Sequence, residues 1–247
     1  MFDVDLASAD WHKIQQSSRK DMWKYSDLLA LGSLENIVSF GEGGTPLLRL
    51  RELERDVGNI RLYAKFECAN PTGTFKDREG SFVISRCVEM GLNQLVFASS
   101  GNTGMSFSTY AESKGLRTYF FCPTRSLYKV NFTKTSSNFL IAFEGTLDET
   151  RDFAKTFAET NKLQFIAPLH ERAEGFTTLA YEQFHELPNA DYYVQTVASG
   201  LGPIGFYYGS QRLVKLGLED KNSIPKIFCI QISEVNPMFL AWSKNRN

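Results

Sequence analysis

Short apolar or aromatic runs alternate with helical patterns along most of this chain of 247 residues. Several runs are almost continuous in apolar side chains, which is typical of strands covered on both faces. The predicted strands span residues 61–67, 94–99, 117–122, 138–144, 163–168, 192–197 and 226–232. The predicted helices span about residues 76–90, 102–114, 148–161, 174–187 and 203–216. This alternation predicts an α/β fold with mostly parallel sheets.

Local signals support the predicted helix ends. Gly91, Gly115 and Gly217 stand where helices would end, and glycine is the residue that most often follows a helix C-terminus. Thr146 and Glu149 have the spacing of a capping box and predict the start of the third helix.

Charge and composition exclude several classes of protein. The 27 basic and 28 acidic side chains leave a net charge of −1, which argues against nucleic-acid and membrane-surface partners. No apolar run approaches the roughly 18 residues of a membrane span, and the acidic first ten residues do not resemble a secretory signal. The 4 cysteines and 3 histidines show neither metal-ligand nor disulfide spacing. We therefore expect a cytoplasmic protein without a metal.

Three polar, glycine-containing loops each follow a predicted strand and precede a predicted helix. They are residues 70–78 (NPTGTFKDR), 99–104 (SSGNTG) and 199–205 (SGLGPIG). Open α/β sheets bind their ligands at such places, where helix N-termini present backbone N–H groups. The loops therefore predict a ligand site.

The first loop carries a lysine at the predicted start of a helix. Pro71 and Gly73 predict a turn, and Lys76 follows it. The partly positive helix N-terminus disfavours a second cation there, which favours an amine that acts as nucleophile or base. The alternative is an ordinary first-turn lysine that faces water.

The other two loops are suited to anions. Ser99, Ser100, Asn102 and Thr103 could hold a carboxylate or phosphate, although the same residues are also common in turns and helix N-caps. The 199–205 loop satisfies the pattern G-x-G-x-x-G, which could hold a dinucleotide or a lone phosphate.

Taken together, these segments resemble the pyridoxal-phosphate enzymes of the tryptophan-synthase-like fold, and most closely the threonine synthases. The likeness also includes the stretch Gly41–Leu47 written GEGGTPL, the approach to it at 23–25, and residues 172–175. It runs from about residue 20 to 240 in the family's order and spacing. The lysine loop is its most specific part.

The resemblance implies roles for individual residues. Lys76 would form the Schiff base with pyridoxal 5′-phosphate and move protons, and Asn102 would hydrogen-bond the 3′-oxygen of the cofactor ring. The cofactor phosphate would lie against Ser199, Gly200, Leu201, Gly202 and Pro203. The residues implied in substrate binding are Ser99, Ser100, Thr103, Thr74 and Arg172, with Lys65 and Arg78 as weaker candidates.

The resemblance also implies an architecture and a reaction. Two open, mostly parallel sheets of fold type II would be divided into an N-terminal part of the large domain (1–76), a small α/β domain (77–165) and the rest of the large domain (166–247). Without the further strands that such proteins carry, the large sheet would have an uncovered edge. The reaction would convert O-phospho-L-homoserine and water to L-threonine and phosphate. Proteins of this family are commonly dimers, so the resemblance also implies a homodimer.

Two departures keep alternatives open. The loop that usually reads Gly-Asn-x-Gly-Asn in this family reads Ser199-Gly-Leu-Gly-Pro203 here. In addition, Glu171 stands beside Arg172, the residue that the resemblance implies for binding the substrate phosphate. A serine/threonine dehydratase or a cysteine-synthase-like enzyme is therefore the near alternative. A binding module without catalysis is the second alternative, and a nicotinamide-dependent oxidoreductase is the last.

Overall fold

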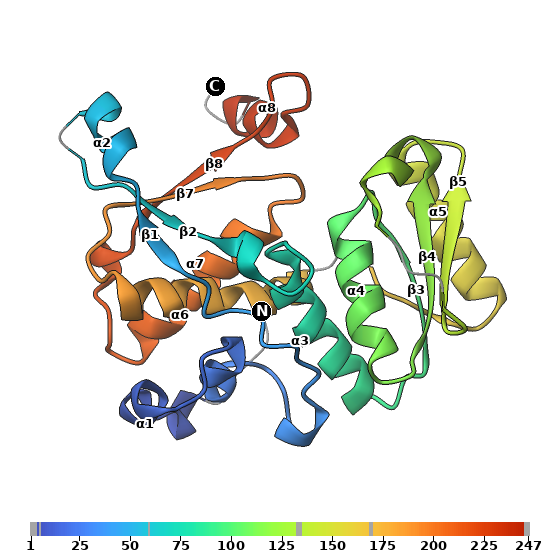
Figure 1. The fold of residues 1–247 in the computed structure, drawn as a ribbon, viewed down its shortest axis with the longest axis horizontal. Helices are drawn as coiled ribbons and strands as arrows, with labels where there is room; N and C mark the ends of the chain where they lie inside the picture. The colour runs from blue at the N-terminus through green and yellow to red at the C-terminus, as the bar shows by residue number, and fades with distance from the viewer. Residues whose placement is uncertain (1–3, 5, 59, 132–134, 168–169, 245–247) are drawn as a thin grey trace.

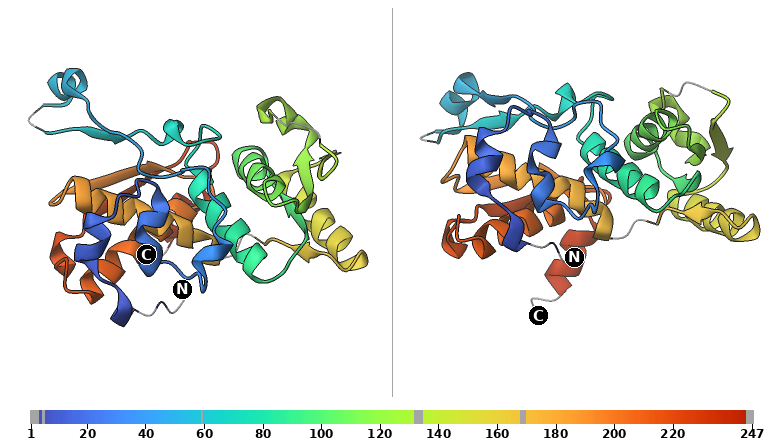
Figure 2. Two further views of the ribbon diagram at one scale, coloured as in Figure 1. Left: turned by 60° about the horizontal axis from the view of Figure 1, so that its bottom comes forward. Right: turned by 90° about the horizontal axis from the view of Figure 1, so that it is seen from below.

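The computed structural model describes residues 4, 6–58, 60–131, 135–167 and 170–244. Its elements form two groups on either side of helix α3 (Lys76–Glu89), as Figures 1 and 2 show. In Figure 1 one group holds the strands β3 to β5, and the other holds β1, β2, β7 and β8. Helix α3 packs against elements of both groups, so the lysine at its start lies where the two groups meet.

The first group is built on a four-stranded parallel sheet in the order β5-β4-β3-β6. Successive side chains along each strand point to opposite faces of the sheet. Phe97 and Phe120 pack with the helices α3 and α4, whereas Val96 and Phe121 pack with α5. The sheet is thus covered on both faces, as its apolar strands require. The strands are β3 (Gln94–Ala98), β4 (Arg117–Pro123), β5 (Asn138–Phe143) and β6 (Gln164–Phe165), and the helices are α4 (Asn102–Glu112) and α5 (Leu147–Thr160).

The second group contains a parallel pair, β7 (Tyr192–Thr196) and β8 (Lys226–Ile230). Tyr193 and Ile227 face the helices α6 (Thr177–Glu186) and α7 (Leu201–Lys215). The opposite face of the pair is exposed. An antiparallel pair, β1 (Leu47–Arg49) and β2 (Tyr63–Lys65), is connected by α2 (Arg51–Val57), and α8 (Pro237–Lys244) follows β8.

The N-terminal segment packs against both groups. It contains the helix α1 (Trp11–Gln16) and 3₁₀ turns, among them Met22–Leu28. Trp23 and Val38 join the core of α3, α4 and the four-stranded sheet, while Leu28 packs with Tyr181 and Leu213 of the second group. Residues 1–76, which the sequence analysis assigned to the large domain, therefore contact both groups. The domain limits themselves stay a prediction.

Most predicted elements are present, with limits that differ by a few residues. The predicted helix 174–187 is split into a 3₁₀ segment, His170–Phe176, and α6, and the helix predicted from 203 begins at Leu201. Strand β6 is shorter than the predicted 163–168, whose last residue lies outside the described residues. β1 and α2 were not predicted, and their antiparallel pairing departs from the expected parallel order.

The predicted helix ends are confirmed. Thr146 accepts the N–H of Glu149, whose carboxylate accepts the N–H of Thr146, and α5 starts there. Gly91, Gly115 and Gly217 all adopt a positive φ just after a helix.

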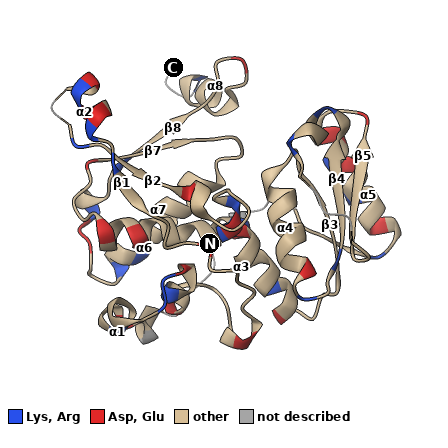
Figure 3. Cartoon of the chain, viewed as in Figure 1, with Lys and Arg blue, Asp and Glu red and all other residues tan. Residues whose placement is uncertain are grey.

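Charges are spread over the surface. Basic and acidic residues are interspersed along both groups of elements in Figure 3, in agreement with the small net charge. Within the described ranges, no helix combines the length and the apolar character that crossing a membrane needs.

Candidate active site

Lys76 is the first residue of α3, and its side chain lies among two aromatic rings and a carboxylate. Its Nζ is 4.6 Å from the ring centroid of Phe75 and 5.0 Å from that of Phe176. Glu79, one helical turn further on, has its Oε2 3.3 Å from the same Nζ. The Lys76 side chain is 16% exposed, so a small molecule can reach its amine.

Glu79 is fully buried and is shared by two cations. Arg172 donates from Nε and pairs through Nη2 to the Oε1 atom of Glu79, while the Oε2 atom faces Lys76. Burying a carboxylate is costly unless it is paired, and both cations meet that requirement here. Arg172 also lies over the ring of Phe107, with its guanidinium carbon 5.1 Å from the ring centroid.

The glycine loop leads into α7 close to the Lys76 surroundings. Gly200 has a φ of +79°, which favours glycine, and the helix begins at the next residue. A Cβ at Gly205 would lie 2.4 Å from the carbonyl oxygen of Ala173 and 2.5 Å from the Cβ of Phe176. Phe176 therefore touches α7 on one side and faces the Lys76 amine on the other.

The serine–asparagine loop reaches the same region through α4. Ser106 of α4 donates a hydrogen bond of 3.2 Å to the carbonyl oxygen of Lys76. A Cβ at Gly80 would lie 2.2 Å from the Ser106 Oγ, so only a glycine lets the two helices approach this closely. Asn102 opens α4 one turn before Ser106, which places both residues on the same side of the helix.

The remaining predicted site residues take up different positions. Thr74 is buried and its Oγ1 accepts the N–H of Lys76 at 3.3 Å. Ser99 accepts the N–H of Gly101 at 3.2 Å, which stabilises the turn before α4. Ser100 and Ser199 lie in the loops before α4 and α7, whereas Thr103 lies in the first turn of α4; none of the three has a hydrogen bond with Lys76 in the described part of the chain. Leu201, Gly202 and Pro203 lie in the first turn of α7 rather than in the loop before it.

Arg78 and Lys65, the weaker candidates for substrate binding, form ion pairs within the protein. Arg78 is completely buried and binds Glu182 at 2.6 Å and Glu67 at 2.7 Å. Lys65 pairs with Glu182 and Glu186, each at 2.8 Å. Burial alone would raise the pKa of the Glu182 carboxyl, but Arg78 and Lys65 outweigh it and lower this pKa to about 2.

Another buried carboxylate, Glu42, lies in the GEGGTPL stretch. Its oxygens accept hydrogen bonds from the Trp23 indole at 3.0 Å and the Tyr110 hydroxyl at 2.8 Å. A Cβ at Gly44 would lie 1.7 Å from the carbonyl oxygen of Lys20, so this backbone contact requires glycine. The stretch thus joins the N-terminal segment to α4, and it also contacts the lysine loop, because the N–H of Gly43 donates to the Oδ1 atom of Asn70 at 2.9 Å.

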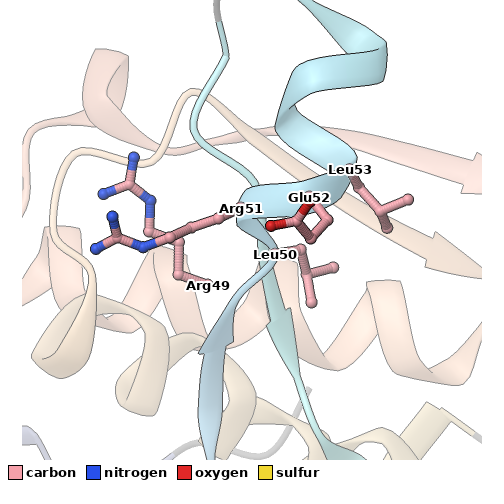
Figure 4. A pocket seen from close by; sticks show the side chains of 5 residues that line it. All are labelled: Arg49, Leu50, Arg51, Glu52 and Leu53. Atoms are coloured by element: carbon pink, nitrogen blue, oxygen red, sulfur yellow. The ribbon is translucent and has the colours of Figure 1, made fainter.

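A separate pocket lies where β1 passes into α2. Figure 4 shows the side chains of Arg49 and Arg51 on one side of this junction and those of Leu50 and Leu53 on the other. Arg49 forms an ion pair with Glu54 at 3.0 Å. None of the predicted site residues lines this pocket, and we do not assign it to the Lys76 site.

Comparison with known proteins identifies the family. The family model described as "Pyridoxal-phosphate dependent enzyme" matches residues 38–247. The chain belongs to this family. Its cofactor is pyridoxal phosphate, which confirms the predicted cofactor and the predicted fold class.

The similar proteins of known sequence include several named threonine synthase. The protein of that name from Methanocaldococcus jannaschii is 30% identical over 90% of this chain and 56% of its own length. The one from Methanosarcina acetivorans is 28% identical over 98% of this chain and 60% of its own length. The resemblance seen in the motifs is thereby confirmed, and the chain spans a little over half the length of these relatives.

Solved structures share the fold. A pyridoxal 5′-phosphate-dependent aspartate racemase superimposes with a TM-score of 0.71 at 20% identity, over 82% of this chain and 61% of that chain. A threonine deaminase from Solanum lycopersicum has a TM-score of 0.67 at 19% identity, over 81% of this chain and 54% of that chain. Because both identities are low, these structures support the fold and not a particular reaction.

Proposed function

We propose that this chain carries the pyridoxal-phosphate site of a threonine-synthase-type lyase, which converts O-phospho-L-homoserine and water to L-threonine and phosphate. One observation carries the proposal. The Lys76 amine lies beside Phe176, and the same Phe176 packs against the helix that follows the glycine loop. The lysine and the glycine loop thus share one set of contacts, and the similar proteins are named for this reaction.

The residues present are suited to the cofactor. The start of α7 leaves the N–H groups of Leu201 and Gly202 without partners inside the helix, and Gly200 turns the chain so that they face outward from its N-terminus. Pro203 supplies no N–H, so Ser199 and these two groups would hold the phosphate. When bound, pyridoxal phosphate supplies an electron sink for charge that develops on the Cα of an amino acid.

The other roles follow from position. Lys76 would bind the cofactor covalently through Nζ and, when released, would move the proton at the substrate Cα. Asn102, at the start of α4, would donate to the ring oxygen of the cofactor. Ser99, Ser100 and Thr103 would hold the substrate carboxylate, and Arg172 with Thr74 the substrate phosphate. A homodimer and a cytoplasmic location also stay predictions.

An absorption spectrum tests the covalent role of Lys76. The purified chain with pyridoxal phosphate should show a visible absorption band, and Lys76→Ala should lack it because Lys76 is the amine that lies over the Phe75 and Phe176 rings among the described residues. Lys155→Ala, at an exposed lysine of α5, is the matched control and should keep the band. Identical spectra for Lys76→Ala and the unmodified chain would exclude the assignment.

A dehydratase is the second candidate, and the Arg172 geometry favours it. Arg172 is already paired with a buried carboxylate, which weakens its attraction for a second, phosphate-borne charge. Release of phosphate from O-phosphohomoserine would support the lyase, whereas release of a 2-oxo acid from serine or threonine would support the dehydratase. A band without either product would indicate a binding module without catalysis.

A further inference from the structure

The contacts of Glu79 are unusual for a buried carboxylate. Its Oε1 receives both contacts from Arg172, while its buried Oε2 faces the Lys76 amine at 3.3 Å and has no hydrogen-bond partner among the described residues. Glu79 itself is 0% exposed, so bulk solvent does not reach the second oxygen. In the described part of the chain, the polar contact of the Oε2 atom is thus its ion pair with Lys76.

The two cations therefore compete for a single negative charge. Lys76 and Arg172 carry two positive charges against the one of Glu79, and the N-terminus of α3 adds a further partial positive charge. The other carboxylate of this helical turn, Asp77, is directed elsewhere, to the N–H and hydroxyl of Thr72, each at 2.6 Å. Glu79 is thus the carboxylate that can stabilise the ammonium form of Lys76.

We propose that Glu79 is a positioning residue for Lys76: it holds the ammonium over the Phe75 and Phe176 rings, and Arg172 limits how strongly it does so. This inference rests on the proposed function only in taking Lys76 as the reactive amine. An amine held in an ion pair must leave that pair before it can attack another molecule, so a firmer pair slows its reaction. The reactivity of Lys76 is then set by how firmly Glu79 holds it while Arg172 shares the same carboxylate.

Removing either partner should change that reactivity in opposite directions. Glu79→Gln removes the carboxylate charge that holds the Lys76 amine, so the amine is released and should react faster. Arg172→Gln leaves all of the Glu79 charge to Lys76, so the amine is held more firmly and should react more slowly. The double variant should lie between the two. General loosening of the fold would instead raise the reactivity in both single variants.

The test is the rate at which acetic anhydride labels Lys76 in the full chain, after hydroxylamine treatment and dialysis have removed carbonyl compounds. The neutral Nζ attacks a carbonyl carbon of the anhydride, acetate leaves, and the amine proton passes to solvent. Peptide mass spectrometry compares this rate with that of Lys155, an exposed lysine whose side chain is 63% accessible. We expect a rate about fivefold higher in Glu79→Gln and about two- to threefold lower in Arg172→Gln, changes of the size usual for one ion pair.

Equal rates in all variants, or a shift in the same direction in both single variants, would overturn the proposal. Should Glu79→Gln fail to fold by circular dichroism, the pair Arg172→Lys and Arg172→Gln decides. The lysine variant keeps the charge and should react like the unmodified chain, and the glutamine variant should react more slowly. Labelling needs no turnover, so it tests the role of Glu79 independently of the reaction. If the chain passes this test but releases no phosphate from O-phosphohomoserine, the proposed reaction is wrong and the role of Glu79 still stands.

Discussion

At the scale of single residues, buried charged side chains, rather than exposed ones, join elements that lie far apart in the sequence. Arg78 and Glu182, both buried, form a network with the partly exposed Glu67 that joins α3 to α6 and to the segment after β2. The lysine loop was recognisable from sequence because its residues are adjacent. The Arg78 network was not, since Glu182 is 104 positions from Arg78 and charge pairing over that separation leaves no local pattern. For the same reason the partner of Glu79, 93 positions away, was missed.

Glu182→Gln should weaken the fold and change its response to acid. Losing one partner leaves Arg78 partly uncompensated, and breaking a buried pair costs about 3 kcal/mol or more. The pKa of Glu182 is lowered from 4.5 to about 2, so its stabilisation is complete above pH 4.5 and is lost as the pH falls from 4.5 toward 2. Urea unfolding across that range should therefore show a shallower pH dependence in the variant.

The control for this prediction is Glu52→Gln, because Glu52 pairs with Arg55 on the surface, where both side chains are more than two-thirds exposed. Its unfolding free energy should change little at any pH. An equal loss in both variants would contradict the special role of the buried network.

At the scale of elements, the sequence pattern predicts the observed helices and strands where an element is long and buried. The strands of the four-stranded sheet were predicted because their apolar runs are covered on both faces. β1 has only three residues, too few to show an alternating pattern, and it was missed together with α2. The sequence predicts an α-helix from residue 174, inside the 3₁₀ segment before α6, because over so short a stretch a 3₁₀ turn and an α-helix space their apolar residues alike.

The close packing of α7 predicts different outcomes at two of its glycines. At Gly205 a methyl group would meet the backbone oxygen of Ala173 at 2.4 Å, which cannot move without shifting the 3₁₀ segment. At Gly202 the nearest atom is the end of the flexible Gln195 side chain, at 2.3 Å. Thermal unfolding should therefore show Gly205→Ala destabilised by about 1–3 kcal/mol, as overpacking usually is.

Gly202→Ala is the matched control, since both substitutions add one methyl group to the same helix and both improve its helix propensity. It should be stable to within about 1 kcal/mol of the unmodified chain, because Gln195 can turn away. If the two variants were equally stable, the contact between α7 and Ala173 would not be as close as the structure has it.

At the scale of the whole molecule, the two faces of the β7–β8 pair differ. One face packs on α6 and α7, while Tyr192 and Val194 are each 58% exposed on the other, with Phe228 and Ile230 each 51% exposed beside them. The resemblance alone predicts an uncovered edge in this sheet. It does not predict an exposed face, because the near-continuous apolar runs of these strands predict cover on both sides.

This exposed face should bind a hydrophobic dye. Contiguous apolar side chains in contact with water bind such probes, so the chain should enhance the fluorescence of anilinonaphthalene sulfonate. Val194→Thr combined with Ile230→Thr keeps β-branched residues in the strands and should lower that fluorescence with little change in unfolding. Ile60→Thr, at an isoleucine 52% exposed outside this face, is the control and should leave the signal almost unchanged. If the double variant bound the dye like the unmodified chain, the face would be covered in solution, and sedimentation should then report a mass above that of one chain.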